Sequence, residues 1–116
     1  MERKITAQKL NRSFAETMQV AEMYYNVLSA VNNLGLTHRE IQLVAFAAVK
    51  GNISYANIRK EFCEQYSSSS ASINNIISRL KKVGVFIKDG TKVKVNPAIV
   101  INFENNIVLQ ITLKHG

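Results

Sequence analysis

Apolar residues recur at helical spacing in several stretches between residues 14 and 83 of this 116-residue chain. The first such stretch follows a capping box from Ser13 to Glu16, in which the two side chains satisfy free amides at a helix start. A helix over 14–33 is predicted, with apolar residues over roughly half of its circumference. Because one small core needs a narrower apolar band, we expect Tyr24 or Val27 to lie at a subunit contact.

Two further helices are predicted before residue 66. A second capping box from Thr37 to Glu40 begins an almost wholly apolar stretch that Gly51 ends, which indicates a buried helix. Ser54 is then expected to cap a short amphipathic helix over about 55–65. The residues expected to face inward in that helix are Tyr55, Ile58 and Phe62.

The fourth predicted helix, over 70–83, has the clearest separation of apolar from basic residues. Four serines at 67–70 favour a turn followed by an N-cap. Apolar residues then recur at helical spacing, at Ile73, Ile76, Ile77, Leu80 and Val83. The other face is polar and basic, and the sequence has no acid between Ser67 and Lys88.

Two hairpins are predicted at the C-terminal end. The β-branched runs 85–88 and 91–95 flank Asp89-Gly90, a pair that type I′ turns favour because both turn residues need a positive φ. Apolar residues then alternate over 99–103 and again over 107–113, which predicts a second hairpin with one polar face. The expected fold class is therefore α+β.

The distribution of charge points to a polyanionic partner. The net charge is +7, and it is concentrated in residues 1–12, which carry +3, and residues 67–95, which carry +5. The segments 13–66 and 96–116 carry −1 and 0. For the basic arm over 1–12, contact with nucleic acid and a charged, disordered terminus both remain open.

Composition argues against several other classes of protein. With 47% hydrophobic and 20% charged residues, the chain has room for one globular domain, 1–116. A single cysteine and two histidines give neither a disulfide nor a set of zinc ligands, so we expect no cofactor, no metal and a cytoplasmic location. No apolar run reaches the roughly 18 residues that span a membrane. The sequence has no pair of acids placed for general acid–base catalysis and no glycine-rich phosphate loop, so we expect that the protein is not an enzyme.

Two parts of the sequence resemble known DNA-binding families. The run from Leu36 to Glu40, which reads Leu-Thr-His-Arg-Glu, is similar with the later Gly51 and Ser54 to the start of LuxR-type effector domains. The run from Leu80 to Ile87, followed by Asp89-Gly90, resembles MarR-type and related winged helices. The resemblance implies a winged helix-turn-helix over 36–95, preceded by an N-terminal helix segment over 13–35 and followed by an extra hairpin over 96–116.

The same resemblance implies duplex DNA as partner and a small transcriptional regulator, acting as a homodimer through helix 14–33. The recognition-helix role carries over to Ser69, Ser70, Ser72, Asn75 and Arg79, and the wing role to Lys88, Lys92 and Lys94. Lys82 completes the candidate DNA-binding set. The chemistry agrees, because asparagine can bond adenine, arginine can bond guanine, serine can bond phosphate and lysines release counterions.

Other interpretations remain open. The basic face of the fourth helix could be an ordinary solvated surface. A winged helix can also serve as an adaptor in a viral particle or on a polymerase, and the C-terminal hairpin would then offer an edge to a protein partner. Finally, the segment from Asn96 to Ile99 is similar to the end of some plasmid replication-initiator domains, which would keep DNA as partner but change the role.

Overall fold

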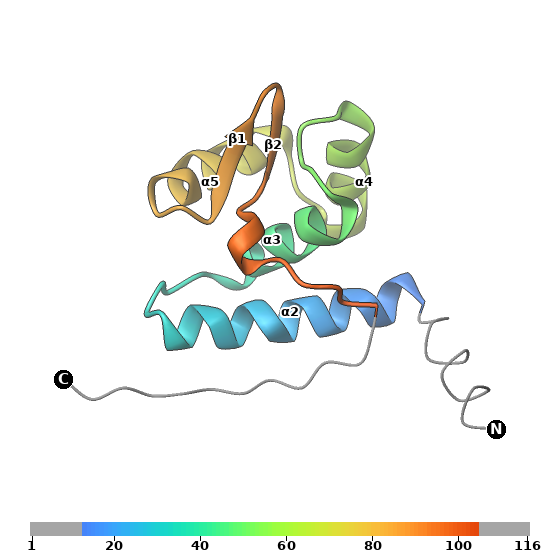
Figure 1. Cartoon of the computed structure of the whole chain (residues 1–116). Helices are drawn as coiled ribbons and strands as arrows, with labels where there is room; N and C mark the ends of the chain where they lie inside the picture. The colour runs from blue at the N-terminus through green and yellow to red at the C-terminus, as the bar shows by residue number, and fades with distance from the viewer. Residues whose placement is uncertain (1–12, 105–116) are drawn as a thin grey trace.

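The computed structural model describes residues 13–104. Within that range, helices α2 (Phe14–Val31), α3 (His38–Lys50), α4 (Ala56–Tyr66) and α5 (Ser70–Lys82) precede one hairpin of strands β1 (Phe86–Asp89) and β2 (Lys92–Val95). A short 3-10 helix, Pro97–Ile99, follows. Figure 1 shows α2 running beneath α3, with α4, α5 and the hairpin on the other side. The α+β class is as expected.

Both predicted capping boxes form. The Ser13 hydroxyl accepts from the Glu16 amide at 3.2 Å while the Glu16 carboxylate accepts from the Ser13 amide at 3.0 Å. Thr37 and Glu40 make the same pair of bonds at the start of α3, at 3.2 and 2.8 Å. Helix α2 ends two residues before the predicted position, because Asn33 takes a left-handed conformation with φ of 55°.

Helix α3 is the centre of the core. Its residues from Leu43 to Ala47 are fully buried, because α2 packs on one side and α4 and the hairpin on the other. Apolar residues from every other described element complete the same core; the largest of them are Tyr25, Phe62, Phe86, Ile53, Ile73 and Leu80. A helix with so few polar residues is stable only when it is covered in this way.

The start of α4 differs from the prediction. Ser54 does not cap the helix; its hydroxyl accepts instead from the Val93 amide of β2. The N-cap is Tyr55, which makes no side-chain capping bond and is 49% exposed rather than directed inward. The amides of Ser54 and Tyr55 donate to Asn52 Oδ1 at 3.0 and 3.3 Å, so a buried asparagine shapes this turn.

The first hairpin forms in the predicted place with a different turn. Asp89 pairs with Lys92, which leaves Gly90 and Thr91 as the two turn residues. Gly90 has a φ of 65° and Thr91 has no positive φ, so a single glycine at the first turn position replaces the type I′ arrangement, as in type II′ turns. The Ile53 amide also donates to the Val93 carbonyl at 2.9 Å and extends the hairpin by one backbone bond.

The second hairpin was predicted wrongly over its first half. Residues Pro97–Ile99 form a 3-10 helix, and no strand occurs over 100–104. Proline has no amide hydrogen and a φ suited to a helix start, and the Asn96 side chain accepts from the Ala98 amide at 3.0 Å. The second half of that hairpin, within 105–116, and the basic arm over 1–12 lie outside the described residues.

Residues 97–104 form a strap across α3 and along α2 (Figure 1). The Tyr25 hydroxyl donates to the Ile99 carbonyl at 2.7 Å. Phe103 is 3% exposed and packs against the rings of Tyr24 and Tyr25, with centroids 5.5 and 5.7 Å away. The strap therefore covers part of the broad apolar face of α2, where the sequence pattern predicts a subunit contact.

Candidate nucleic-acid interface

Helix α5 presents an exposed polar stripe opposite its buried face. Its residues Ile73, Ile76, Ile77 and Leu80 are buried, as predicted, whereas Val83, the fifth residue of the predicted apolar stripe, is the C-cap and is 57% exposed. Successive residues of a helix are rotated by about 100°, so positions 71, 75, 78 and 82 lie most directly opposite this buried face. These four residues, Ala71, Asn75, Ser78 and Lys82, are all exposed and are called the outer stripe below.

The three serines expected at the start of α5 have different environments. Ser69 is the N-cap, and its hydroxyl accepts from the Ser72 amide at 3.1 Å. Ser70 is exposed, whereas Ser72 is half-buried. The N-terminus of α5 thus lies at the surface, where free backbone amides can meet an anion such as a phosphate.

Arg79 lies beside the outer stripe and is engaged within the protein. Its Nε donates to Glu40 Oε2 at 2.7 Å, and its Nη2 contacts the same oxygen. Glu40 is buried, and its other oxygen accepts from the Thr37 amide. The structure therefore brings Arg79 to the capping residue of α3, and the side chain ties α5 to α3.

The three hairpin lysines also have different environments. Lys88 is exposed. Lys92 lies over the Tyr55 ring, 5.9 Å from its centroid. Lys94 forms an ion pair of 2.9 Å with Asp89, and the hydrogen bond and charge of Lys94 lower the pKa of that carboxyl. Since this pair neutralises the single acid of the hairpin, the charge left at its surface is positive.

Sequence reasoning missed the side chains that hold α5 in place. Arg59 of α4 donates to the Ile53 carbonyl at 2.8 Å and to Asn74 Oδ1 at 2.7 Å, and so links α4, the loop before it and α5. Neither this link nor the pair of Glu40 with Arg79 has a sequence signal. Arg59 and Asn74 are 15 positions apart, and Glu40 and Arg79 are 39 positions apart, so no local pattern connects them. The exposed Tyr55 beside Lys92 was missed because helical spacing placed it inward.

On α2, the structure narrows the surface available to a second subunit. Tyr24 is half-buried against Tyr25 and Phe103, so it is part of the intramolecular packing. Burial raises the pKa of the Tyr25 hydroxyl well above its usual value, and the neighbouring Tyr24 adds to the effect. Met23 and Val31 remain 54% and 47% exposed, with the half-buried Val27 between them.

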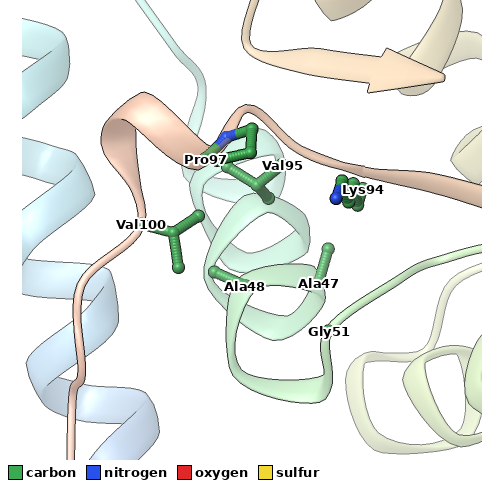
Figure 2. Close-up of a pocket in the computed structure, with 7 residues that line it drawn as sticks. All are labelled: Ala47, Ala48, Gly51, Lys94, Val95, Pro97 and Val100. Carbon is green, nitrogen blue, oxygen red and sulfur yellow. The ribbon is translucent and has the colours of Figure 1, made fainter. Parts of the chain in front are cut away.

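Two small pockets lie along the strap. One, of about 190 Å³, is bounded by the end of α3, by β2 and by the strap residues Pro97 and Val100, as Figure 2 shows. The other, of about 220 Å³, lies between Thr17, Val49 and the strap from Ile101 to Glu104. Both are below the roughly 300 to 1,000 Å³ typical of small-molecule sites. Neither is lined by residues of the outer stripe.

Two features are absent from the part of the chain that the structure describes. Over 13–104, no group of three histidine, cysteine, aspartate or glutamate residues is placed to hold a metal ion. Among the helices of that same range, none is long and apolar enough to cross a membrane. His38 is exposed, and Cys63 is partly buried and packs against the core.

Comparison with known proteins gives no match. No family model, no curated protein and no solved structure matches this chain.

Proposed function

We propose that this protein binds duplex DNA, with α5 in the major groove and the hairpin lysines against the phosphates. The observation that carries the proposal is the exposed, acid-free face of α5 beside a lysine-bearing hairpin. In a helix-turn-helix, the second helix contacts base edges while neighbouring elements contact the backbone. Helices α4 and α5, followed by the hairpin, have the order and the surface chemistry for that arrangement.

The acids near this surface are neutralised, which strengthens the case. Glu40 is paired with Arg79 and Asp89 with Lys94. Lys81 and Lys82 of α5 and Lys88 and Lys92 of the hairpin make no ion pair within the described residues, so α5 and the hairpin keep a net positive charge. A polyanion gains free energy on such a surface by releasing condensed counterions. A solvated helix face with no partner has no need to exclude acids over more than twenty residues.

The test is the salt dependence of binding to random 30-base-pair duplex, measured with the full chain. If about four lysines meet phosphates, the logarithm of affinity falls with the logarithm of salt concentration with a slope of about −3.6. The double variant Lys88→Gln/Lys92→Gln flattens that slope by about two. Lys50→Gln is the control for removal of a single lysine charge. Lys50 pairs with Glu61 of α4 and lies over the Phe14 ring of α2, so this variant should leave the slope unchanged.

An affinity that does not change with salt, or no binding at all, overturns the proposal. Capture of a protein partner without any DNA binding would favour the adaptor alternative. Among DNA-binding roles we favour transcriptional regulation, as the resemblance implies.

We also propose that the regulator is a homodimer through α2. Val27 lies four residues from both Met23 and Val31, so a two-fold axis at Val27 would pair the Met23 of one copy with the Val31 of the other. Such a dimer doubles the contact with DNA and raises affinity through linked binding. Light scattering at micromolar concentration tests it. The wild type should be dimeric and Val27→Glu a folded monomer with weaker DNA binding; a monomeric wild type overturns the dimer and leaves the DNA proposal standing.

A further inference from the structure

We infer that α5 reads A·T base pairs, an inference that rests on the proposed function and specifies the sequence bound. The side chains free to enter a groove are those of the outer stripe: Ala71, Asn75, Ser78 and Lys82. On its two flanks, two side chains that could read bases are held by bonds within the protein, while Lys81 is exposed and can contact phosphate. Asn74 accepts from Arg59 on one flank, and Arg79 donates to Glu40 on the other.

The position of Arg79 argues against recognition of guanine by α5. Bidentate bonding of arginine to guanine is the commonest specific contact in the major groove. The guanidinium of Arg79 instead bonds the buried Glu40 through two nitrogens. Turning it toward DNA would leave that carboxylate buried without its partner, which is costly. The arginine of α5 is thus unavailable as a guanine reader.

The first half of the outer stripe has the chemistry for adenine and thymine. An asparagine amide bonds adenine through both its oxygen and its nitrogen, and an alanine methyl packs against the thymine methyl. Ala71 and Asn75 are one helical turn apart, about 6 Å along the axis, which corresponds to roughly two base-pair steps of about 3.4 Å. Two nearby A·T pairs fit this spacing.

The second half of the stripe adds little discrimination. A serine hydroxyl such as that of Ser78 bonds to any base edge that offers a donor or an acceptor. Lys82 is the last residue of α5, whereas recognition helices contact bases through their N-terminal residues. We therefore assign Lys82 to a phosphate and Asn75 to the base that sets the specificity.

The experiment selects bound sequences from a random duplex library with the full wild-type chain and then measures affinities for the selected duplex. The expected result is enrichment of two nearby A·T pairs, and an affinity about tenfold lower when a G·C pair replaces the one that Asn75 reads. Asn75→Ala should abolish that tenfold difference. Asn57→Ala, which removes an exposed asparagine of α4, should preserve it.

Three results would count against the inference in different ways. Enriched sequences with guanine in place of those A·T pairs overturn it, and so does an Asn75→Ala variant that weakens every duplex equally. Both leave the proposal of DNA binding intact. Failure of the wild type to bind any duplex at low salt overturns the proposed function itself.

Discussion

Helices α2 and α5 are both amphipathic, yet the protein completes their surfaces in opposite ways. On α2, the strap over 97–104 covers apolar surface that α3 leaves uncovered, and the aromatic rings of Tyr24, Tyr25 and Phe103 gather there. On α5, the face away from the core stays uncovered and carries polar and basic groups. The same helical pattern thus gives a structural face on one side of the molecule and a candidate binding face on the other.

The contacts that fix α2 and α5 in the fold also differ in chemical type. Around α2 the contacts are aromatic, with one hydrogen bond from Tyr25 to the strap. Around α5 they are polar, through Arg59 and through the pair of Glu40 with Arg79. Substitutions in the packing between α2 and the strap should therefore change stability and spare DNA binding. Substitutions on the outer stripe should do the reverse.

The largest effect on stability is expected for Phe103→Ala. The ring is almost fully buried against two tyrosines, and truncation of a buried phenylalanine costs about 3 to 5 kcal/mol. Urea unfolding of the purified variant measures the loss. Ile101→Ala, in the same strap but at an exposed position, should cost less than about 1 kcal/mol.

Below its unfolding transition, Phe103→Ala should bind duplex with wild-type affinity. If the folded variant loses DNA binding instead, the strap side takes part in recognition and the division between the two regions is wrong.

A smaller effect on stability, of about 2 kcal/mol, is expected for Glu40→Gln. Removing the charge of a buried partner is costly, but the Arg79 side chain is 52% exposed, so water screens part of the interaction. The variant also frees Arg79 beside the outer stripe. DNA affinity should therefore rise. The slope of the logarithm of affinity against the logarithm of salt concentration should become more negative by about 0.9, as for one additional phosphate contact. Thermal unfolding and salt titration measure the two changes.

Glu61→Gln is the matched control for this prediction. It removes an equal charge from an exposed ion pair with Lys50, so stability should change by less than about 1 kcal/mol. A Glu40→Gln variant that loses stability without any change in salt dependence would show that Arg79 stays away from DNA even when it is free.

The helices and the first hairpin could be predicted because their signals are local. Capping boxes at Ser13 and Thr37, and a left-handed glycine at 51, act within one turn of the helix that they begin or end. The start of α4 could not be predicted in the same way. Ser54 looks like an N-cap in sequence, and only the folded chain brings the Val93 amide within its reach.

The candidate site was predictable in outline and not in its detail. Helical spacing alone places Asn75 and Lys82 opposite the core. The commitment of Arg79 depends on Glu40, which is 39 positions away and looked in sequence only like a capping residue. The strap was missed for a related reason. Alternating apolar residues over 99–103 suit a strand, but Pro97 begins a 3-10 helix and the Phe103 ring packs against Tyr24 of α2.

The smallest expected effect at neutral pH is that of Tyr25→Phe, and its pH dependence makes it specific. Loss of the hydroxyl that donates to the Ile99 carbonyl should cost about 1 kcal/mol. In the unfolded chain a tyrosine ionises near pH 10, whereas burial raises the pKa of Tyr25 in the folded protein. The folded state therefore keeps a proton that the unfolded state releases. The free energy of unfolding should fall above pH 10 by up to about 1.4 kcal/mol per pH unit from this group.

Urea unfolding at pH values from 8 to 11 would measure this dependence in wild type and variant. Tyr25→Phe should be less stable than wild type at pH 8, and the difference should shrink or reverse toward pH 11, because phenylalanine has no proton to lose. Tyr55→Phe, at an exposed position, should keep the wild-type alkaline decline. If Tyr25→Phe declines as steeply as wild type, the hydroxyl is not held in the buried bond to the strap, and the α2 side of the molecule is more open than the comparison with α5 requires.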